Sequence, residues 1–468
     1  MSGLLGALNS GKTSLEANQV ALEVAGNNIA NVNTEGYSRQ EVDLSTIPSF
    51  SMKGFFIGNG VSADSVQREH DNFMEAQLVS KTAEYGYQNA QTNTLSELER
   101  IFPVTDDNIS SSISNFFDSV QTLSDDPSDQ VARNTLLQKG QELSQKFVST
   151  SEELTSLQSN LNLSINSSVE DINDKLEEIA SLNTEIQVIE LSGQGANGQR
   201  DEQEALIRDL SESIGAKTYT AGNGMAALYL PGGLPLVQGT SAMSFSVENT
   251  GTTTDLKLNI DGDQKTLTAD SVGGELKGYL EMRDETIPGV LDRLDQLAYH
   301  ITEEINTQHS AGVDLNGDVG TDFFEEVPNK AYVLNSAEEE WSGAAASMGV
   351  NITDSNKIAA GNSSAPGDNE NLLAIADLDT KKVDGNDTFN TIIGEITSDI
   401  GAKSARQQLS LSSAEDSVTQ ITNMKESLTG VSLEEEMIDL MKFQRSYQSS
   451  AKFLSTVDEM METLINLR

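Results

Sequence analysis

Residues 4–29 read LLGALNSGKTSLEANQVALEVAGNNI, and apolar or small residues recur in this stretch at alternating gaps of four and three. This spacing is the 3.5-residue repeat of helices that pack lengthwise against one another. The large apolar side chains of the repeat are Leu4, Leu8, Leu15, Leu22 and Ile29. We expect a long N-terminal helix that packs its apolar side against other helices.

A second repeat of this kind ends the chain. Three glutamates follow Leu433, and negative charge in the first turn stabilises a helix. Apolar residues then recur at gaps of three, four or seven; those expected at a subunit interface are Met437, Leu440, Tyr447, Leu454, Val457, Met461 and Leu464. We expect residues 1–35 and 430–468 to form a paired, coiled-coil-like terminal domain that leaves apolar surface for neighbouring subunits.

Between these ends the sequence predicts a mainly α fold with a small β insertion, an α+β organisation. Apolar residues at gaps of three or four predict a helix over 129–191, within an elongated helical central domain of residues 36–215, 275–310 and 387–429. Short alternating runs separated by Gly and Asn predict an outer β domain over 216–274. Residues 311–386 are expected to form a loop-rich region packed on the central domain or the β domain.

The composition excludes several classes of protein. Asp and Glu number 73 against 29 Lys and Arg, which gives a net charge of −44. A nucleic-acid-binding surface needs clustered basic residues, so we expect no nucleic-acid partner. The chain has no Cys and three His, and the acidic pairs have no partner base beside them, so we expect no catalytic, cofactor or metal site and no enzyme activity. No stretch approaches the 18 apolar residues of a membrane span, so we expect no membrane insertion.

Residues 6–13, GALNSGKT, match the phosphate-loop pattern at every fixed position. The pattern binds phosphate when a strand leads into the glycine-rich turn, and only five residues precede Gly6. The same residues belong to the helical repeat. We therefore interpret the match as a coincidence within a helix, with nucleotide binding as the weaker alternative.

Residues 314–325, DLNGDVGTDFFE, resemble a twelve-residue calcium loop, with oxygen-bearing side chains at its first, third, fifth, ninth and twelfth positions. Val319 stands where the loop needs a glycine, and Pro328 follows where a helix would begin. We prefer an Asx-rich turn that Phe323 and Phe324 anchor on a helical core. Calcium binding by Asp314 to Glu325 is the alternative.

Two stretches carry a family resemblance. Residues 27–40, NNIANVNTEGYSRQ, are similar to the N-terminal signature of bacterial flagellar axial proteins, and the signature residues are Asn28, Asn31, Asn33, Gly36, Tyr37 and Arg39. Residues 443–448, FQRSYQ, through 459–466, EMMETLIN, are similar to the C-terminal signature of the same proteins. Within that group, 36–40 (GYSRQ), 199–201 (QRD), 314–324 and 367–371 (GDNEN) resemble the FlgK-type hook-associated proteins.

The resemblance implies a structural subunit of the flagellum that joins hook to filament. It further implies a ring of identical copies, contacts with the hook protein and with a second junction protein on the filament side, and an export chaperone that holds the C-terminal helix in the cytosol. It places the mature protein outside the cell, exported unfolded and without a cleaved signal peptide. The alternative assignments are a hook or distal rod axial protein and, from the calcium loop, a calcium-binding secreted protein.

Overall fold

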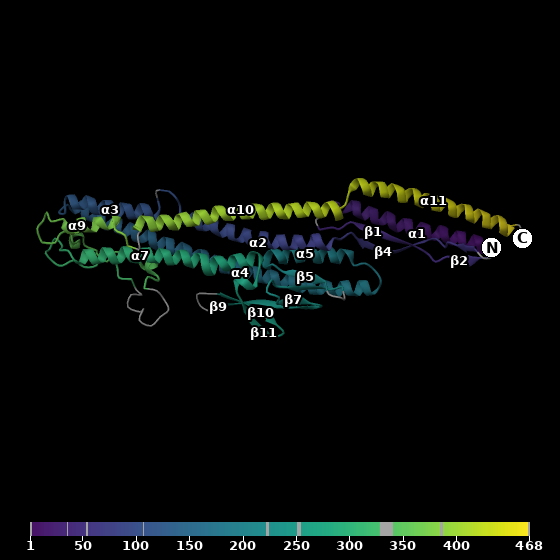
Figure 1. Ribbon diagram of the computed structural model, residues 1–468, viewed down its shortest axis with the longest axis horizontal. Helices are drawn as coiled ribbons and strands as arrows, with labels where there is room; N and C mark the ends of the chain where they lie inside the picture. Colours follow the sequence, from purple (N-terminus) through teal and green to yellow (C-terminus); the bar gives the residue numbers. More distant parts are fainter. Residues whose placement is uncertain are drawn as a thin grey trace. The chain divides into compact units, whose positions relative to one another are not determined.

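The computed structural model describes residues 2–34, 36–52, 55–105, 107–220, 224–249, 254–327, 340–383 and 387–466 (Figure 1). The chain divides into two compact units. Unit 1 comprises residues 1–87, 168–275 and 413–468, and unit 2 comprises residues 88–167 and 276–412. The predicted fold class, mainly α with a small β insertion and long terminal helices, is confirmed.

Unit 1 contains both terminal helices, α1 (Ser2–Ala30) and α11 (Leu433–Asn466). It also contains α5 (Asn197–Ile214), the first part of α2 (Asn72–Ile101), the second part of α4 (Gln130–Leu191) and the end of α10 (Phe389–Thr429). The predicted helix over 129–191 agrees with α4 to within one residue.

Four strands follow α1 in unit 1. They are β1 (Gln40–Thr46), β2 (Phe50–Met52), β3 (Phe55–Ile57) and β4 (Val61–Arg68), and they pair antiparallel as β1 with β4 and β2 with β3. The predicted helical domain over 36–215 is therefore wrong for residues 40–68. Half-buried and exposed side chains largely alternate along β1, the period of a strand lying on another element.

The predicted β insertion forms two antiparallel sheets. One has the strand order β5-β6-β7-β8, from β5 (Lys217–Thr220), β6 (Ala226–Tyr229), β7 (Pro235–Gln238) and β8 (Ser241–Ala242). The other has the order β11-β10-β9, from β9 (Ser244–Asn249), β10 (Thr254–Ile260) and β11 (Asp263–Leu267). Two asparagines of α4 hold the sheets, because Asn173 exchanges two hydrogen bonds with the backbone of Phe245, and Asn183 does the same with Ala226.

Unit 2 has its core between helices. These are α3 (Ile109–Asp125), α6 (Gly274–Glu281), α7 (Ile287–Ser310), the short α8 (Ala344–Ser347) and α9 (Glu370–Ala376), with parts of α2, α4 and α10. Aromatic rings lie at the centre of this core: Phe116, Phe117, Phe323, Phe324 and Phe389. A π-helical turn, Met282–Thr286, separates α6 from α7 just before Pro288, which has no N–H to continue the hydrogen-bond ladder.

Candidate assembly site

Helices α1 and α11 pack side by side and antiparallel, with both chain ends at the same end of the pair (Figure 1). Three contacts give the register: Gly11 lies against Leu454, the hydroxyls of Ser14 and Ser450 are 2.9 Å apart, and the side chain of Asn28 donates to Glu436. The terminal helices predicted from the two repeats therefore pair with each other within one chain.

Small residues lie on the buried side of α1. Ala17, Ala21 and Ala25 are buried, and a methyl group added at Gly11 would lie 3.1 Å from side-chain atoms of Leu454 and Phe453. Small side chains let two helix backbones approach closely, and Gly11, a member of the predicted repeat, lies at this contact.

Most of the residues predicted for a subunit interface keep exposed surface. Among them Val457 is buried and Met437 is 57% exposed, while the side chain of Leu464 lies outside the described residues. The others are half-buried: Leu4, Leu8, Leu15, Leu22, Ile29, Leu440, Tyr447, Leu454 and Met461. The intramolecular pair therefore leaves apolar surface on both helices.

A buried amide joins the end of α1 to the start of α11. Asn28 is 1% exposed and makes four hydrogen bonds. Its Nδ2 donates to Gln40 O at 2.9 Å and to Glu436 Oε2 at 3.0 Å, and its Oδ1 accepts from Tyr37 Oη at 2.8 Å and Gln40 N at 3.0 Å. An amide side chain has two donors and two acceptor sites, so every one of them is used.

Glu436 is the acidic partner at this junction and is 2% exposed. Its second oxygen accepts from Arg39 Nε at 2.8 Å, and Arg39 also lies 3.8 Å from Glu435 and 4.0 Å from Asp439. Burial lowers the pKa of Arg39, but the hydrogen bond and the charge of Glu436 raise it overall. Arg39 N also donates to Thr429 O, at the last residue of α10. Arg39 therefore binds both the end of α10 and, through Glu436, the first turn of α11.

A second set of contacts ties the same segment to α5. Ser38 N donates to Asp201 Oδ2 at 3.2 Å, and Arg68 donates to Asp201 Oδ1 at 2.9 Å and to Glu204. Burial, reinforced by the charges of Asp201 and Glu436, raises the pKa of Tyr37 to about 12, so this phenol stays a hydrogen-bond donor at neutral pH.

Some of the signature residues belong to the buried network, and the others lie in the turn that follows α1. Asn28, Tyr37 and Arg39 belong to the buried network, and Gly36 has a φ of +78°, which favours glycine. Asn31 bonds within the turn that follows α1, to Asn27 and Thr34, while Asn33 is exposed in that turn.

A buried ion cluster lies farther along unit 1. Glu75 of α2 accepts from Arg208 of α5 at 2.9 Å and from Lys425 of α10. Burial raises the pKa of Glu75, but the two positive charges lower it overall, so the carboxylate remains ionised. The cluster joins three helices of unit 1 close to the start of the terminal domain.

The phosphate-loop match lies inside α1, as the helical interpretation predicts. Lys12 is exposed and lies 3.4 Å from Glu16, one turn farther along the helix. No strand precedes these residues in the part of the chain that the structure describes.

The calcium-loop match folds as an Asx turn. Asp314 Oδ1 accepts from Asn316 N at 2.8 Å and from Asp318 N at 2.9 Å. Phe323 and Phe324 are buried in the core of unit 2, so the predicted turn and anchor are confirmed. Among the described residues, no group of three or more His, Asp or Glu side chains is placed to hold a metal ion.

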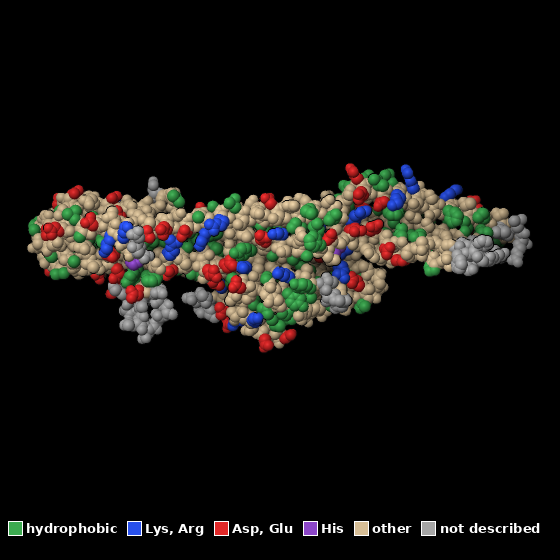
Figure 2. Space-filling view, viewed as in Figure 1, with side chains coloured by type: hydrophobic (Ala, Val, Ile, Leu, Met, Phe, Trp, Pro, Cys, Tyr) green, Lys and Arg blue, Asp and Glu red, His purple; other side chains and the backbone are tan. Residues whose placement is uncertain are grey.

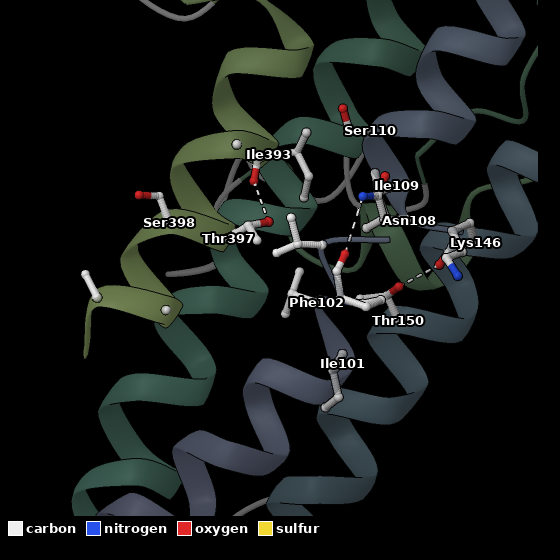
Figure 3. Close-up of a pocket in the computed structure, with 15 residues that line it drawn as sticks. Ile101, Phe102, Asn108, Ile109, Ser110, Lys146, Thr150, Ile393, Thr397 and Ser398 are labelled. Atoms are coloured by element: carbon white, nitrogen blue, oxygen red, sulfur yellow. Dashed lines mark hydrogen bonds between the residues drawn. The ribbon is translucent and has the colours of Figure 1, made fainter. Parts of the chain in front are cut away.

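Unit 2 contains an apolar cavity of about 590 Å³ between the ends of α2 and α3 and the side of α10 (Figure 3). The hydroxyls of Thr150 and Thr397 donate to carbonyls of their own helices, and Asn108 donates to Pro103 O. These polar groups therefore do not converge on the space, as catalysis would require.

None of the described helices combines the length and the hydropathy needed to cross a membrane.

The acidic half of the junction is not evident from the sequence. The sequence pattern relates Glu436 to the helix dipole and Asp201 to a family signature, and it predicts no contact for Glu75 or Lys425. Asn28 and Glu436 lie 408 positions apart, so no local spacing relates them. Ala17, Ala21 and Ala25 are buried and have regular four-residue spacing, a pattern that could have been found in the sequence.

Comparison with known proteins gives three family matches. Residues 95–324 match the flagellar hook-associated protein FlgK helical domain, residues 427–467 match the flagellar basal body rod FlgEFG protein C-terminal family, and residues 8–37 match the flagella basal body rod protein family. The two rod-type matches cover α11 and most of α1, and the FlgK match spans the helical middle and the β insertion.

Whole-chain relatives agree with these matches. The chain is 29% identical to flagellar hook-associated protein 1 of Escherichia coli K12, over 98% of this chain and 99% of the relative. It is 28% identical to the Bacillus subtilis protein of that name, over 100% and 99%. In fold, it resembles the flagellar hook junction protein FlgK of Burkholderia pseudomallei, with a TM-score of 0.68 at 15% identity, over 76% of this chain and 100% of the other.

Proposed function

The chain belongs to the family of flagellar hook-associated protein 1, a structural component of the flagellum at the junction of hook and filament, and we propose that its terminal helix pair is the part that assembles there. The observation that carries this proposal is the terminal pair itself. Its buried network fixes α11 on α1, while Met437, Ile438 and Met441 remain about half exposed or more.

The energetics support assembly through these side chains. Burying a methionine or leucine side chain completely contributes about 1.5–3 kcal/mol. Several such residues on one rigid helix supply more than an isolated contact would, because the network has already fixed the helix orientation. A ring of identical copies, contacting the hook protein on one side and a second junction protein on the other, would bury this surface.

We further propose that the chain is exported unfolded, without a cleaved signal peptide, and that a cytosolic chaperone holds α11 before export. Exposed methionines adapt to many partners and associate nonspecifically until covered. In Figure 2, hydrophobic side chains are visible over α11 on the face shown. A chaperone on this helix would cover the same side chains that later face neighbouring subunits.

The role that we propose is structural and without catalysis. The ionisable groups of the junction are engaged with one another, as between Arg39 and Glu436 and between Arg68 and Asp201. Such pairs support a rigid joint, which is what a subunit joining two tubes requires.

The test replaces the outward methionines of α11. Met437→Lys with Met441→Lys should give hooks without filaments in a strain lacking the natural protein, because the charged side chains cannot be buried between subunits. The matched control is Leu191→Lys at the exposed end of α4, where the side chain is 81% exposed. Adding purified variants to isolated hooks separates assembly from export; normal filament growth with the double variant would contradict the proposal.

A further inference from the structure

Resting on the proposed assembly through the terminal helix pair, we propose that Met437 and Met441 form a reversible oxidation site. Peroxide converts their thioethers to sulfoxides in the free chain, and the oxidised chain does not join the flagellum until a methionine sulfoxide reductase restores them. The two residues lie four positions apart on α11 and therefore share one side of the helix. Met437 is 57% exposed and Met441 is 49% exposed.

The methionines of this chain differ sharply in exposure. Among those whose side chains the structure describes, the ones at least 45% exposed all lie in the last turns of α10 or in α11: Met424, Met437, Met441 and Met460. Those of the β insertion and of the unit 2 core are only 2–8% exposed: Met225, Met243, Met282 and Met348. An oxidant dissolved in water therefore reaches the thioethers near the C-terminus well before those inside either unit.

Sulfur oxidation in this chain falls on methionine alone, because the sequence contains 12 Met and no Cys. No thiol competes for the oxidant, and no disulfide forms in place of a sulfoxide. The proposed location outside the cell is an oxidising environment. The exposed methionines of α11 are therefore the groups on which an extracellular oxidant acts first.

The reaction requires no reagent other than peroxide. A lone pair of the thioether sulfur attacks one peroxide oxygen, the S–O bond forms as the O–O bond breaks, and the second oxygen leaves as water. The sulfur is oxidised and the peroxide is reduced. In the reverse reaction two thiols of the reductase become a disulfide, and the sulfoxide oxygen leaves as water.

Oxidation alters the surface of α11 without altering its attachment to α1. Glu436, the neighbour of Met437, is 2% exposed and bonds to Asn28 and Arg39, and none of these side chains contains sulfur. The helix pair therefore stays folded while a polar sulfoxide replaces an apolar thioether on its exposed side. Burying that sulfoxide oxygen between subunits without a hydrogen-bond donor is unfavourable, so the oxidised chain does not assemble.

The experiment treats the purified full chain with hydrogen peroxide, removes the peroxide with catalase, and adds the chain and untreated filament components to isolated hooks. We expect the treated wild type to support roughly tenfold fewer filaments than the untreated chain, because the sulfoxides cannot be buried favourably. Methionine sulfoxide reductase with dithiothreitol should restore filament growth.

Two variants identify the methionines responsible. Met437→Leu with Met441→Leu keeps the apolar surface and the helix propensity but cannot form a sulfoxide, so it should support filaments before and after treatment. The control, Met424→Leu, changes another exposed methionine and should remain sensitive to peroxide. Equal peroxide sensitivity of the double leucine variant and the wild type would overturn the proposal.

Peptide masses at increasing peroxide doses test the wild type without any substitution. The peptide with Met437 and Met441 should gain oxygen before the peptides with Met282 and Met348, and the loss of filaments should follow the first peptide. Filament growth by chains oxidised at both Met437 and Met441 would overturn the proposal, and so would loss that follows a different methionine. This dose series and the reductase rescue decide the outcome even where the untreated leucine variant supports no filaments.

Failure of the proposed function has a separate signature. Normal filament growth with Met437→Lys and Met441→Lys would show that the terminal pair is not the assembling part. A block by the lysines together with normal growth by the oxidised wild type would overturn the oxidation site alone. Circular dichroism should show unchanged helix content after peroxide treatment, and a loss of helix would contradict an effect confined to the surface.

Discussion

At the residue scale, the junction depends on side chains whose hydrogen bonds are complete. Asn28, Tyr37, Arg39 and Glu436 connect α1, the segment after it and α11 with distances of 2.8–3.0 Å. A buried polar group left without a partner is costly, so the network acts as a unit in which one loss affects several residues.

Replacing Asn28 with Ala should loosen the terminal pair. The change leaves the buried Glu436 and the Gln40 backbone short of partners, and an unsatisfied buried group costs roughly 1–3 kcal/mol. Hydrogen exchange should accelerate in α1 and α11 while unit 2 keeps its protection. Asn33→Ala, in the exposed part of the turn, should leave both helices unchanged; equal acceleration by the two variants would show that the network is not specific.

His309 should make unit 2 sensitive to mild acid. The ring is 1% exposed; its Nδ1 donates to Thr321 O, and its Nε2 accepts from Ala359 N at 2.9 Å. Protonation of Nε2 would remove that acceptor. Burial lowers the pKa of His309 below the ordinary 6.5; the hydrogen bond to Thr321 O and the charges of Asp322 and Asp314 oppose this effect, and Arg133 reinforces it.

Because the folded state resists this protonation, the unfolded state takes up more protons as the pH falls below about 6.5, and stability declines there. Denaturant unfolding at pH 7.5 and pH 5.5 measures the decline. His309→Gln, which cannot titrate, should have a lower stability at pH 7.5 but a smaller loss between the two values. An equal loss in both proteins would assign the pH dependence to other groups.

At the scale of elements, the sequence predicted what depends on local spacing. The repeats identified α1, α4 and α11, and alternation identified the β insertion. Strands β1 and β4 were missed because their side chains are half-buried or exposed and few of them are apolar. The pairing of Asn28 with Glu436 and of Glu75 with Arg208 could not be predicted, since each pair joins segments more than 100 positions apart and depends on the three-dimensional path of the chain.

The loop after α7 matches the calcium-loop pattern, but its side chains stabilise an Asx turn. Asp314→Ala removes two backbone hydrogen bonds of the Asx turn and should lower the stability of unit 2 by about 1–2 kcal/mol. Asp318→Ala should have a smaller effect. Melting curves with and without calcium should coincide for the natural chain and for both variants. A calcium-dependent rise in Tm that Asp314→Ala abolishes would instead establish a calcium site.

At the scale of the whole molecule, charge is the dominant property. With 73 acidic and 29 basic residues, most carboxylates have no basic residue available to neutralise them, although local pairs such as Arg39 with Glu436 do form. Self-repulsion on this scale opposes compaction and also opposes the approach of identical copies. Both effects act through the solvent and are therefore sensitive to salt.

The isolated chain should consequently melt at a higher temperature as NaCl rises at neutral pH. The screening length falls from about 10 Å at 0.1 M to about 3 Å at 1 M, so repulsion between neighbouring carboxylates weakens over this range. Near pH 4.2, the pI, the net charge is close to zero and the same salt increase should raise the Tm far less. Melting followed by circular dichroism at both pH values measures the difference. A Tm at pH 7 that does not rise with salt would mean that repulsion does not limit the stability of this chain.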